Sequence, residues 1–154
     1  MRLLVLGGTM FLGRHIVAAD LARGREVTLF NRGQQNPDLF PDVEKLRGDR
    51  DANLTALAGR TWDAVVDTCG YVPRIVGASA ELLADAVEHY TFISSISVYA
   101  EPYGPNMDEA ASTGTLKDES VEEVTGEAYG PLKALCEQSV RCHGRAVPSL
   151  YERA

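Results

Sequence analysis

Short apolar segments alternate with helical patterns along most of this chain, and this alternation restricts its fold more than any other feature. Strands are expected at 2–7, 25–31, 43–48, 62–70 and within 89–99, and helices at 10–23, 52–59, 73–87 and 129–143. Because the strand segments are almost continuously apolar, they are typical of a parallel sheet that helices cover on both faces. The pattern predicts an α/β fold with a doubly wound, Rossmann-like parallel sheet.

Residues 100–127 break this alternation. Between Asp108 and Glu127 the sequence has seven acidic residues and one lysine. We expect a long acidic surface loop, which is either a solvated connection or a functional segment. The loop would belong to a single domain over residues 1–144, followed by an irregular or truncated tail over 145–154.

The net charge and the cysteine and histidine content limit which partners the protein can bind and in which cell compartment it is expected. The 154 residues carry a formal net charge of −7, which argues against a nucleic-acid partner because phosphate backbones select positive surfaces. Three cysteines without C-x-x-C spacing indicate reduced thiols, and three scattered histidines give no metal-ligand spacing. No apolar stretch is long enough to span a bilayer and no leader pattern is present, so we expect a cytoplasmic protein with no membrane partner.

The segment "LVLGGTMFLGRH", residues 4–15, joins the first expected strand to the first expected helix. Its glycines fit G-x-x-G-x-x-G only if Met10 stands at the middle position. In this setting a glycine turn and a helix N-terminus present backbone N–H groups to a pyrophosphate. Gly7 would make the tight turn, and Gly13 would let the helix pack closely on the sheet. The alternative is a glycine turn that holds no ligand.

The end of the second expected strand reads "FNRG". A site for NAD usually has an acidic residue there to hold the ribose hydroxyls, but this chain has Asn31 and Arg32. A guanidinium can hold a 2′-phosphate with two hydrogen bonds, which favours NADP. The alternative is an exposed arginine in a loop.

The segment "YGPLK" places Tyr129 and Lys133 four residues apart on the last expected helix, so the two side chains share a face. The positive charge of a lysine favours the phenolate form of a nearby tyrosine. Tyr129 could then exchange a proton with a substrate oxygen, and Lys133 could also hold a ribose.

These motifs, in this order, resemble those of the extended and atypical short-chain dehydrogenase/reductases, the NAD-dependent epimerase/dehydratase family. "GGTMFLGRHIV" is similar to the G-G-T-x-F-x-G variant of that family, in which the middle glycine is regularly replaced. The resemblance covers residues 1–143 and implies a Rossmann NAD(P)-binding domain with oxidoreductase, epimerase or dehydratase chemistry on a small-molecule substrate.

The resemblance also implies roles for individual residues. The cofactor would contact Gly7, Thr9, Met10, Phe11, Leu12 and Gly13 in the pyrophosphate loop, Asn31, Arg32, Asp49 and Arg50 around the adenosine, and Thr68, Cys69 and Gly70 in the turn after the fourth strand. Ser95, Tyr129 and Lys133 would form the catalytic triad, with Tyr129 and Lys133 also touching the cofactor. The serine orients the substrate, the tyrosine transfers the proton, and the nicotinamide of NADP or NAD transfers hydride.

The end of the sequence departs from this family, in which another strand with an R-P-G-like motif and a smaller substrate domain follow the last helix. This chain ends "CHGRAVPSLYERA", so it looks like a truncated cofactor half. We expect an open sheet edge with possible self-association, and little activity from this chain alone. A non-catalytic nucleotide-binding module or an inactive remnant stays open as an alternative, as does, with less support, an RNA-binding relative.

Overall fold

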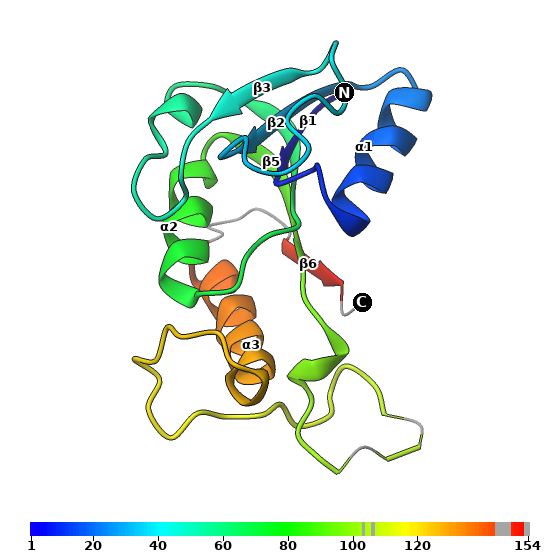
Figure 1. The fold of residues 1–154 in the computed structure, drawn as a ribbon. Coiled ribbons are helices and arrows are strands. Elements are labelled where there is room, and N and C mark those ends of the chain that lie inside the picture. Colours follow the sequence, from blue (N-terminus) through cyan, green and yellow to red (C-terminus); the bar gives the residue numbers. More distant parts are fainter. Residues whose placement is uncertain (103, 106, 144–148, 153–154) are drawn as a thin grey trace.

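The computed structural model describes residues 1–102, 104–105, 107–143 and 149–152, which form one parallel sheet with helices on both faces (Figure 1). The strands are β1 (Arg2–Leu6), β2 (Glu26–Asn31), β3 (Glu44–Arg47), β4 (Trp62–Asp67), β5 (Val87–Ile93) and β6 (Ser149–Glu152). The helices are α1 (Phe11–Ala22), α2 (Pro73–Leu83) and α3 (Gly126–His143), with 3₁₀ turns η1 (Thr55–Leu57) and η2 (Ile96–Val98). The expected Rossmann-like α/β fold is confirmed.

The strand order is β3-β2-β1-β4-β5-β6, and every neighbouring pair is parallel. The chain runs outward from β1 to β3, then returns and continues on the other side of β1 with β4. In the register of the sheet, Leu4 of β1 lies between Thr28 of β2 and Val65 of β4. The boundary between β1 and β4 is therefore the point where the winding direction reverses, and ligands of such sheets bind outside the carboxyl ends of the strands there.

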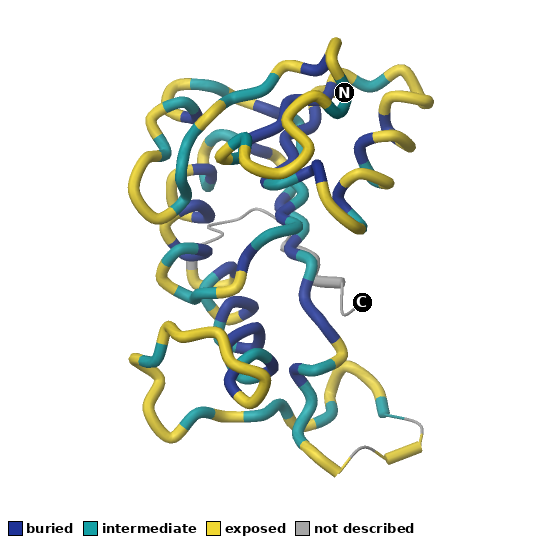
Figure 2. Tube along the Cα trace, viewed as in Figure 1, coloured by how far each residue is buried: buried dark blue, intermediate teal, exposed yellow. Residues whose placement is uncertain are grey.

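Alternate side chains of the strands build two cores. Leu4 and Leu6 of β1 join the cluster that α2 and α3 cover, whereas Leu3 and Val5 join the cluster that Val17 of α1 covers. Figure 2 shows the buried residues concentrated in the sheet and on the helix faces that meet it. Full burial of one such side chain stabilises the fold by about 1.5–3 kcal/mol, so the two clusters fix the helices on opposite faces of the sheet.

Several boundaries differ from the sequence-based expectation for identifiable reasons. The helix expected at 52–59 is only the turn η1, and the strand expected within 89–99 begins earlier at Val87 and ends at Ile93. It ends there because Ser95 caps η2 by accepting a hydrogen bond from the Ser97 N–H at 3.2 Å. Helix α3 starts before the expected residue, where the Thr125 hydroxyl accepts from the Ala128 N–H at 3.2 Å.

The expectation that β5 would be left as an open edge was wrong. Residues Ser149–Glu152 form β6, which pairs with β5 from Tyr90↔Ser149 to Ile93↔Glu152. This pairing supplies β5 with the backbone hydrogen bonds that an edge strand lacks. The tail expected to be irregular over 145–154 therefore contains a strand at 149–152, and the rest of that stretch lies outside the described residues.

The acidic segment forms a long connection between η2 and α3 that contains no helix or extended strand among its described residues. An isolated antiparallel β-bridge pairs Tyr99 with Thr113 in the first part of this connection. In the second part, Glu122 forms an ion pair with Arg74 of α2 at 2.7 Å, which attaches the connection to that helix. No helix of the described chain is both long and apolar enough to cross a membrane.

Candidate functional site

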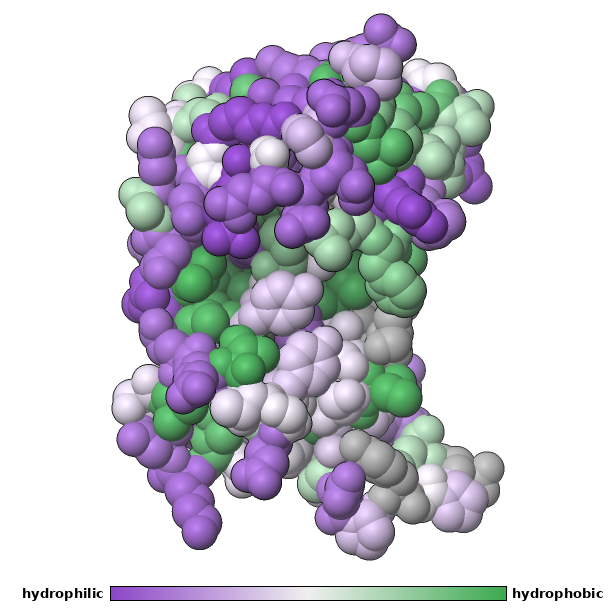
Figure 3. Space-filling view, in the orientation of Figure 1, coloured by the Kyte–Doolittle hydropathy of each residue, from purple (hydrophilic) through white to green (hydrophobic). Residues whose placement is uncertain are grey.

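A cleft of about 730 Å³ lies along the carboxyl ends of the strands, at the winding reversal. The segments that line it are residues 7–12, 30–35, 48–51, 68–69, 71–72, 75, 93–94, 124, 129 and 133. Figure 3 shows apolar residues gathered across the middle of the molecule, beneath a hydrophilic upper part. Residues after five strands, on α1, α2 and α3 and in the acidic connection thus line one cavity.

The glycine turn after β1 forms the first part of the cleft. Gly7 has a φ of +99°, and its N–H donates to the Phe30 carbonyl at 2.9 Å. A Cβ at Gly13 would lie 3.0 Å from the Thr68 hydroxyl and 3.0 Å from the Gly8 Cα, so a larger residue there would require its neighbours to shift slightly. The first N–H groups of α1 have no acceptors within the helix and point out of its N-terminus. The turn and the close packing expected of Gly7 and Gly13 are both present.

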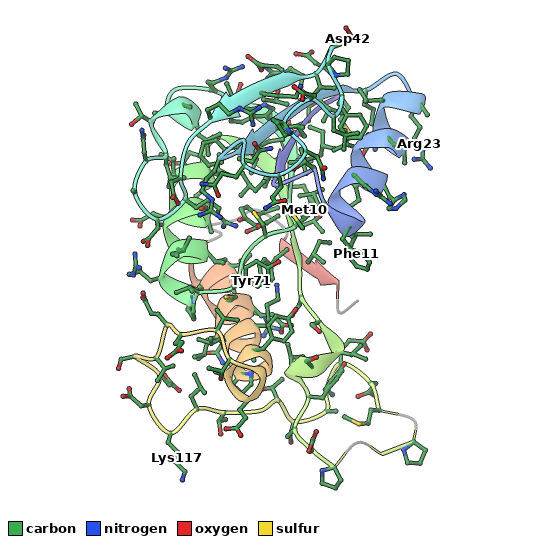
Figure 4. The ribbon with its side chains drawn as sticks, viewed as in Figure 1. Met10, Phe11, Arg23, Asp42, Tyr71 and Lys117 are labelled. Atoms are coloured by element: carbon green, nitrogen blue, oxygen red, sulfur yellow. The ribbon has the colours of Figure 1, made fainter. Side chains whose placement is uncertain are left out.

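Met10 and Phe11 occupy the entrance of this part. Met10, where the motif lacks its middle glycine, has extended backbone at the N-cap and is 56% exposed, and Phe11 is 88% exposed. Figure 4 shows both side chains on the α1 side of the cleft and Tyr71 nearer to α3. The methionine side chain is accommodated at the surface rather than between α1 and the sheet, so the missing glycine does not close the turn.

The corner beyond the glycine turn contains Asn31, Arg32 and Asp49, as the sequence predicts for an adenosine site. The Asn31 amide donates to the Gly7 carbonyl at 2.9 Å, and its oxygen accepts from the Gly33 N–H at 2.9 Å and from the Arg47 guanidinium. Asn31 therefore holds the turns around the corner in place. Arg32 is exposed and lines the cleft, where its guanidinium faces solvent-accessible space.

Arg50 lines the cleft beside Asp49, and its expected contact with a cofactor stays a prediction. Its guanidinium donates two hydrogen bonds to the buried Asp67 carboxylate, at 2.7 and 2.8 Å, and a third to the Ser79 hydroxyl at 3.0 Å. The Tyr90 hydroxyl donates to the same carboxylate at 2.9 Å. Burial by itself would lower the pKa of Arg50, but attraction to Asp67, Tyr90 and Cys69 and the hydrogen bonds to Asp67 together raise that pKa. Arg50 thus forms part of the wall of the cleft through a buried ion pair.

The thiol of Cys69 lies against this ion pair. Burial raises the pKa of Cys69, and the charge of Asp67 raises it further. A protonated thiol is a poor nucleophile, and the Cys69 sulfur accepts from the Arg50 guanidinium at 3.7 Å, so Cys69 lines the cleft as an unreactive thiol.

The far end of the cleft holds Tyr129 and Lys133, which share one face of α3 as expected. The Lys133 ammonium donates to the carbonyl of Gly70 at 2.8 Å and to that of Ile93 at 2.6 Å, and the residue is 3% exposed. Burial lowers the pKa of Lys133, while attraction to Asp67 opposes this shift. The Phe92 ring lies 4.1 Å from the ammonium, and the Tyr71 ring 5.5 Å. The side chain of Lys133 is therefore held in a fixed position at this end.

Helix α3 reaches this position because it packs directly on η2. A side chain at Gly130 would overlap the Ser97 carbonyl oxygen, so the two backbones could not touch with any other residue there. The contact brings the neighbouring Tyr129 to the cleft, where its ring lies 6.4 Å from that of Tyr71.

Three of the predicted site residues do not line the cleft. Gly13 and Gly70 lie behind it, and Gly70 contributes through its carbonyl on Lys133. Ser95 is buried, and its hydroxyl accepts from the Ser97 N–H and donates to the Ser97 hydroxyl at 3.2 Å. The catalytic role of Ser95 stays a prediction.

Sequence reasoning also missed residues that line the cleft, among them Tyr71 and Ser94. Tyr71 directly follows the predicted turn "TCG", so that turn could have been extended by one residue. Ser94 is the first serine of "ISSISVY", and counting back from "VY" selected only its neighbour.

No protein-family model matches the sequence. Among curated proteins it is similar to "Chloroplast stem-loop binding protein of 41 kDa b, chloroplastic" from Arabidopsis thaliana, at 28% identity over 85% of this chain and 43% of that protein. It is also similar to "3 beta-hydroxysteroid dehydrogenase/Delta 5-->4-isomerase" from Mycobacterium tuberculosis, at 35% identity over 51% of this chain and 21% of that protein. The chain therefore spans less than half the length of these relatives.

Solved structures share the fold over nearly the whole chain. The UDP-Glc/GlcNAc 4-epimerase from Campylobacter jejuni matches with a TM-score of 0.80 at 15% identity, over 99% of this chain and 52% of that one. The Bordetella bronchiseptica enzyme WbmG in complex with NAD matches with a TM-score of 0.78 at 19% identity, again over 99% and 52%. At these identities the likeness establishes the Rossmann-like fold, and the chain spans about half of each neighbour.

The buried ion pair in the cleft wall gives a stability prediction. Arg50→Met should lower the free energy of unfolding by about 3–5 kcal/mol, because it leaves the Asp67 carboxylate buried without a counter-charge. The double variant Arg50→Met/Asp67→Leu should regain most of that loss, since it removes both charges. Urea unfolding of the parent, both single variants and the double variant measures the coupling. Additive effects of the two single changes would contradict the pairing.

Proposed function

We propose that the chain binds a nicotinamide dinucleotide along the cleft and belongs to an oxidoreductase, epimerase or dehydratase of the short-chain dehydrogenase/reductase type. The observation that carries this proposal is the continuity of the cleft from the glycine turn at the α1 N-terminus to Tyr129 and Lys133. One dinucleotide would reach from the glycine turn to Tyr129 and Lys133. The fold neighbours include NAD-bound enzymes, which supports this choice of ligand.

We infer from the strand order where each part of the ligand would lie in the cleft. The pyrophosphate would lie on the turn after β1, where the free N–H groups of α1 and its helix dipole favour an anion. The adenosine would lie toward β2 and β3, near Asn31, Arg32 and Asp49. The nicotinamide would then lie over β4 and β5, near Thr68, Cys69 and Lys133.

The chemistry of the far end fits proton transfer beside such a ligand. An ammonium has three N–H donors, and Lys133 uses two of them on the Gly70 and Ile93 carbonyls, which leaves one for a ribose hydroxyl. Its positive charge also favours the phenolate form of Tyr129 during transfer of a proton to or from a substrate oxygen. The bound nicotinamide would supply the hydride transfer, and Ser95 would assist in orienting the substrate.

Two other functions remain as alternatives. A nucleotide-binding module without catalysis would use the same cleft up to Lys133 but would not need Tyr129. The second alternative is RNA binding, in view of the similarity to a stem-loop binding protein from Arabidopsis thaliana. The net charge of −7 favours the dinucleotide over RNA, because binding to a phosphate backbone relies on positive surface charge.

The proposal predicts stabilisation by dinucleotide. A ligand that binds only the native state raises its stability by about 2.7 kcal/mol at a hundredfold excess over Kd. NADP(H) or NAD(H) at millimolar concentration should therefore raise the melting temperature of the chain, whereas nicotinamide alone should not. No shift with either dinucleotide would refute the proposed function.

Arg32 should set the preference between the two dinucleotides. Arg32→Asp replaces a donor for the 2′-phosphate with a repelling carboxylate, so the affinity for NADPH should fall about tenfold or more relative to NADH. Isothermal titration with both ligands measures the ratio. Lys117→Asp, the same change in charge in the acidic loop away from the cleft (Figure 4), should leave the ratio unchanged. An unchanged ratio in Arg32→Asp would show that this arginine is only a loop residue.

Tyr129 should be required for turnover but not for binding. We expect low turnover from these 154 residues, because substrate positioning can account for about 7–11 kcal/mol of barrier lowering and the chain spans about half of its fold neighbours. Tyr129→Phe should reduce that turnover by a further ~10²–10⁴-fold while NADPH still binds. NADPH oxidation with aldehydes, ketones and sugar nucleotides measures it. Tyr71→Phe is the matched control, and an equal loss in both variants would contradict a specific role for Tyr129.

A further inference from the structure

Ser94 presents the one buried side-chain polar atom without a hydrogen-bond partner among the residues that the structure describes. The residue is 5% exposed, and it lines the cleft at the carboxyl end of β5. A buried hydroxyl that lost its water partners without gaining others destabilises the native state. Such groups are rare in native proteins, and each calls for an explanation.

The neighbours of Ser94 have their polar groups in use. The Ile93 carbonyl accepts from the Lys133 ammonium at 2.6 Å, and the Ser95 hydroxyl is engaged with Ser97 in capping η2. Of the two adjacent serines, Ser94 lines the cleft and keeps its hydroxyl unpaired, whereas Ser95 does neither. Rotation about a single bond can direct a serine hydroxyl toward a ligand without moving the backbone.

The place of Ser94 in the sheet indicates which part of a ligand it would meet. Neighbouring strands lie about 4.8 Å apart, so the end of β5 is roughly 10 Å from the glycine turn after β1, with β4 between them. The adenosine corner at Asn31 and Asp49 lies on the opposite side of β1. A dinucleotide held at its centre by the turn would therefore present its other half to Ser94 and Lys133.

We propose that Ser94 is a ligand-contacting residue whose hydroxyl forms its missing hydrogen bond with a hydroxyl or carboxamide group on the nicotinamide half of the dinucleotide. This inference rests on the proposed function and assigns a residue that the sequence motifs did not select. It also explains the unpaired hydroxyl. The hydrogen bond that the Ser94 hydroxyl gives up to water on folding would be replaced by one to the bound dinucleotide.

The test separates affinity from stability. In Ser94→Ala the unpaired hydroxyl is removed, so the melting temperature of the ligand-free protein should stay equal or rise. The dissociation constant for NAD⁺ or NADP⁺ should increase about five- to tenfold, as expected for one lost neutral hydrogen bond. The dissociation constant for ADP, which lacks the nicotinamide half, should not change. ADP-ribose has the second ribose but no carboxamide, so it distinguishes the two groups. If Ser94→Ala weakens ADP-ribose as much as NAD⁺, the partner is a ribose hydroxyl; if only NAD⁺ is weakened, the partner is the carboxamide.

Ser139→Ala is the matched control. Its hydroxyl donates to the Leu135 carbonyl at 3.1 Å on α3, and the residue does not line the cleft, so its removal should leave all these affinities unchanged. If Ser94→Ala lowers the melting temperature and leaves the ratio of dinucleotide to ADP affinity unchanged, Ser94 is structural and the inference fails. An equal loss for ADP would also overturn it. If the unaltered chain binds no dinucleotide, the proposed function fails as well.

Discussion

The close approach of three backbone segments at the winding reversal is the constraint on which the rest of the site depends. The Thr68 N–H and hydroxyl both donate to the Leu6 carbonyl, at 3.1 and 2.8 Å, which joins the end of β4 to the end of β1. Gly13 brings the first turn of α1 against the same Thr68. Because a side chain at Gly13 would crowd both Thr68 and the backbone of Gly8, the glycine favours this close approach of the helix N-terminus to the ends of β1 and β4. The exposed positions of Met10 and Phe11 follow from that arrangement.

The Arg50–Asp67 pair provides a second, independent support. It joins the segment after β3 to the end of β4 across the cluster that α2 covers, with Ser79 and Tyr90 completing its hydrogen bonds. Ion pairs of this kind add little net stability compared with apolar residues of the same shape, but they tolerate few alternative arrangements. The pair therefore acts mainly by fixing how the Asp49 loop meets the turn at Thr68. The corner of the cleft at Asn31 and Asp49 is thus held by this ion pair and by the hydrogen bonds of Asn31 to Gly7 and Gly33.

The parts of the molecule that local sequence determines could be predicted, and those that depend on distant partners could not. Strand and helix periodicity, the turn at Gly7 and the shared face of Tyr129 and Lys133 each depend on a few consecutive residues. Arg50 lies in a turn and its partner Asp67 lies 17 residues further on, at the end of β4, so no local pattern reveals the pair. The same limit applies to β6, whose pairing with β5 requires the whole sheet. Between Ser94 and Ser95, only the packing of η2 shows which hydroxyl is already engaged.

Lys133 joins the turn after β4 to the end of β5, because its ammonium donates to one main-chain carbonyl in each segment. A residue that bridges two loops is retained by selection for a foldable chain even after any chemistry has been lost. Its presence is therefore no record of enzymatic use, and a Lys133 substitution mixes structural damage with chemical damage. Among the described residues, neither the Tyr129 nor the Ser94 side chain forms such a bridge, so drift at those two positions would reveal whether a lineage still uses the cleft.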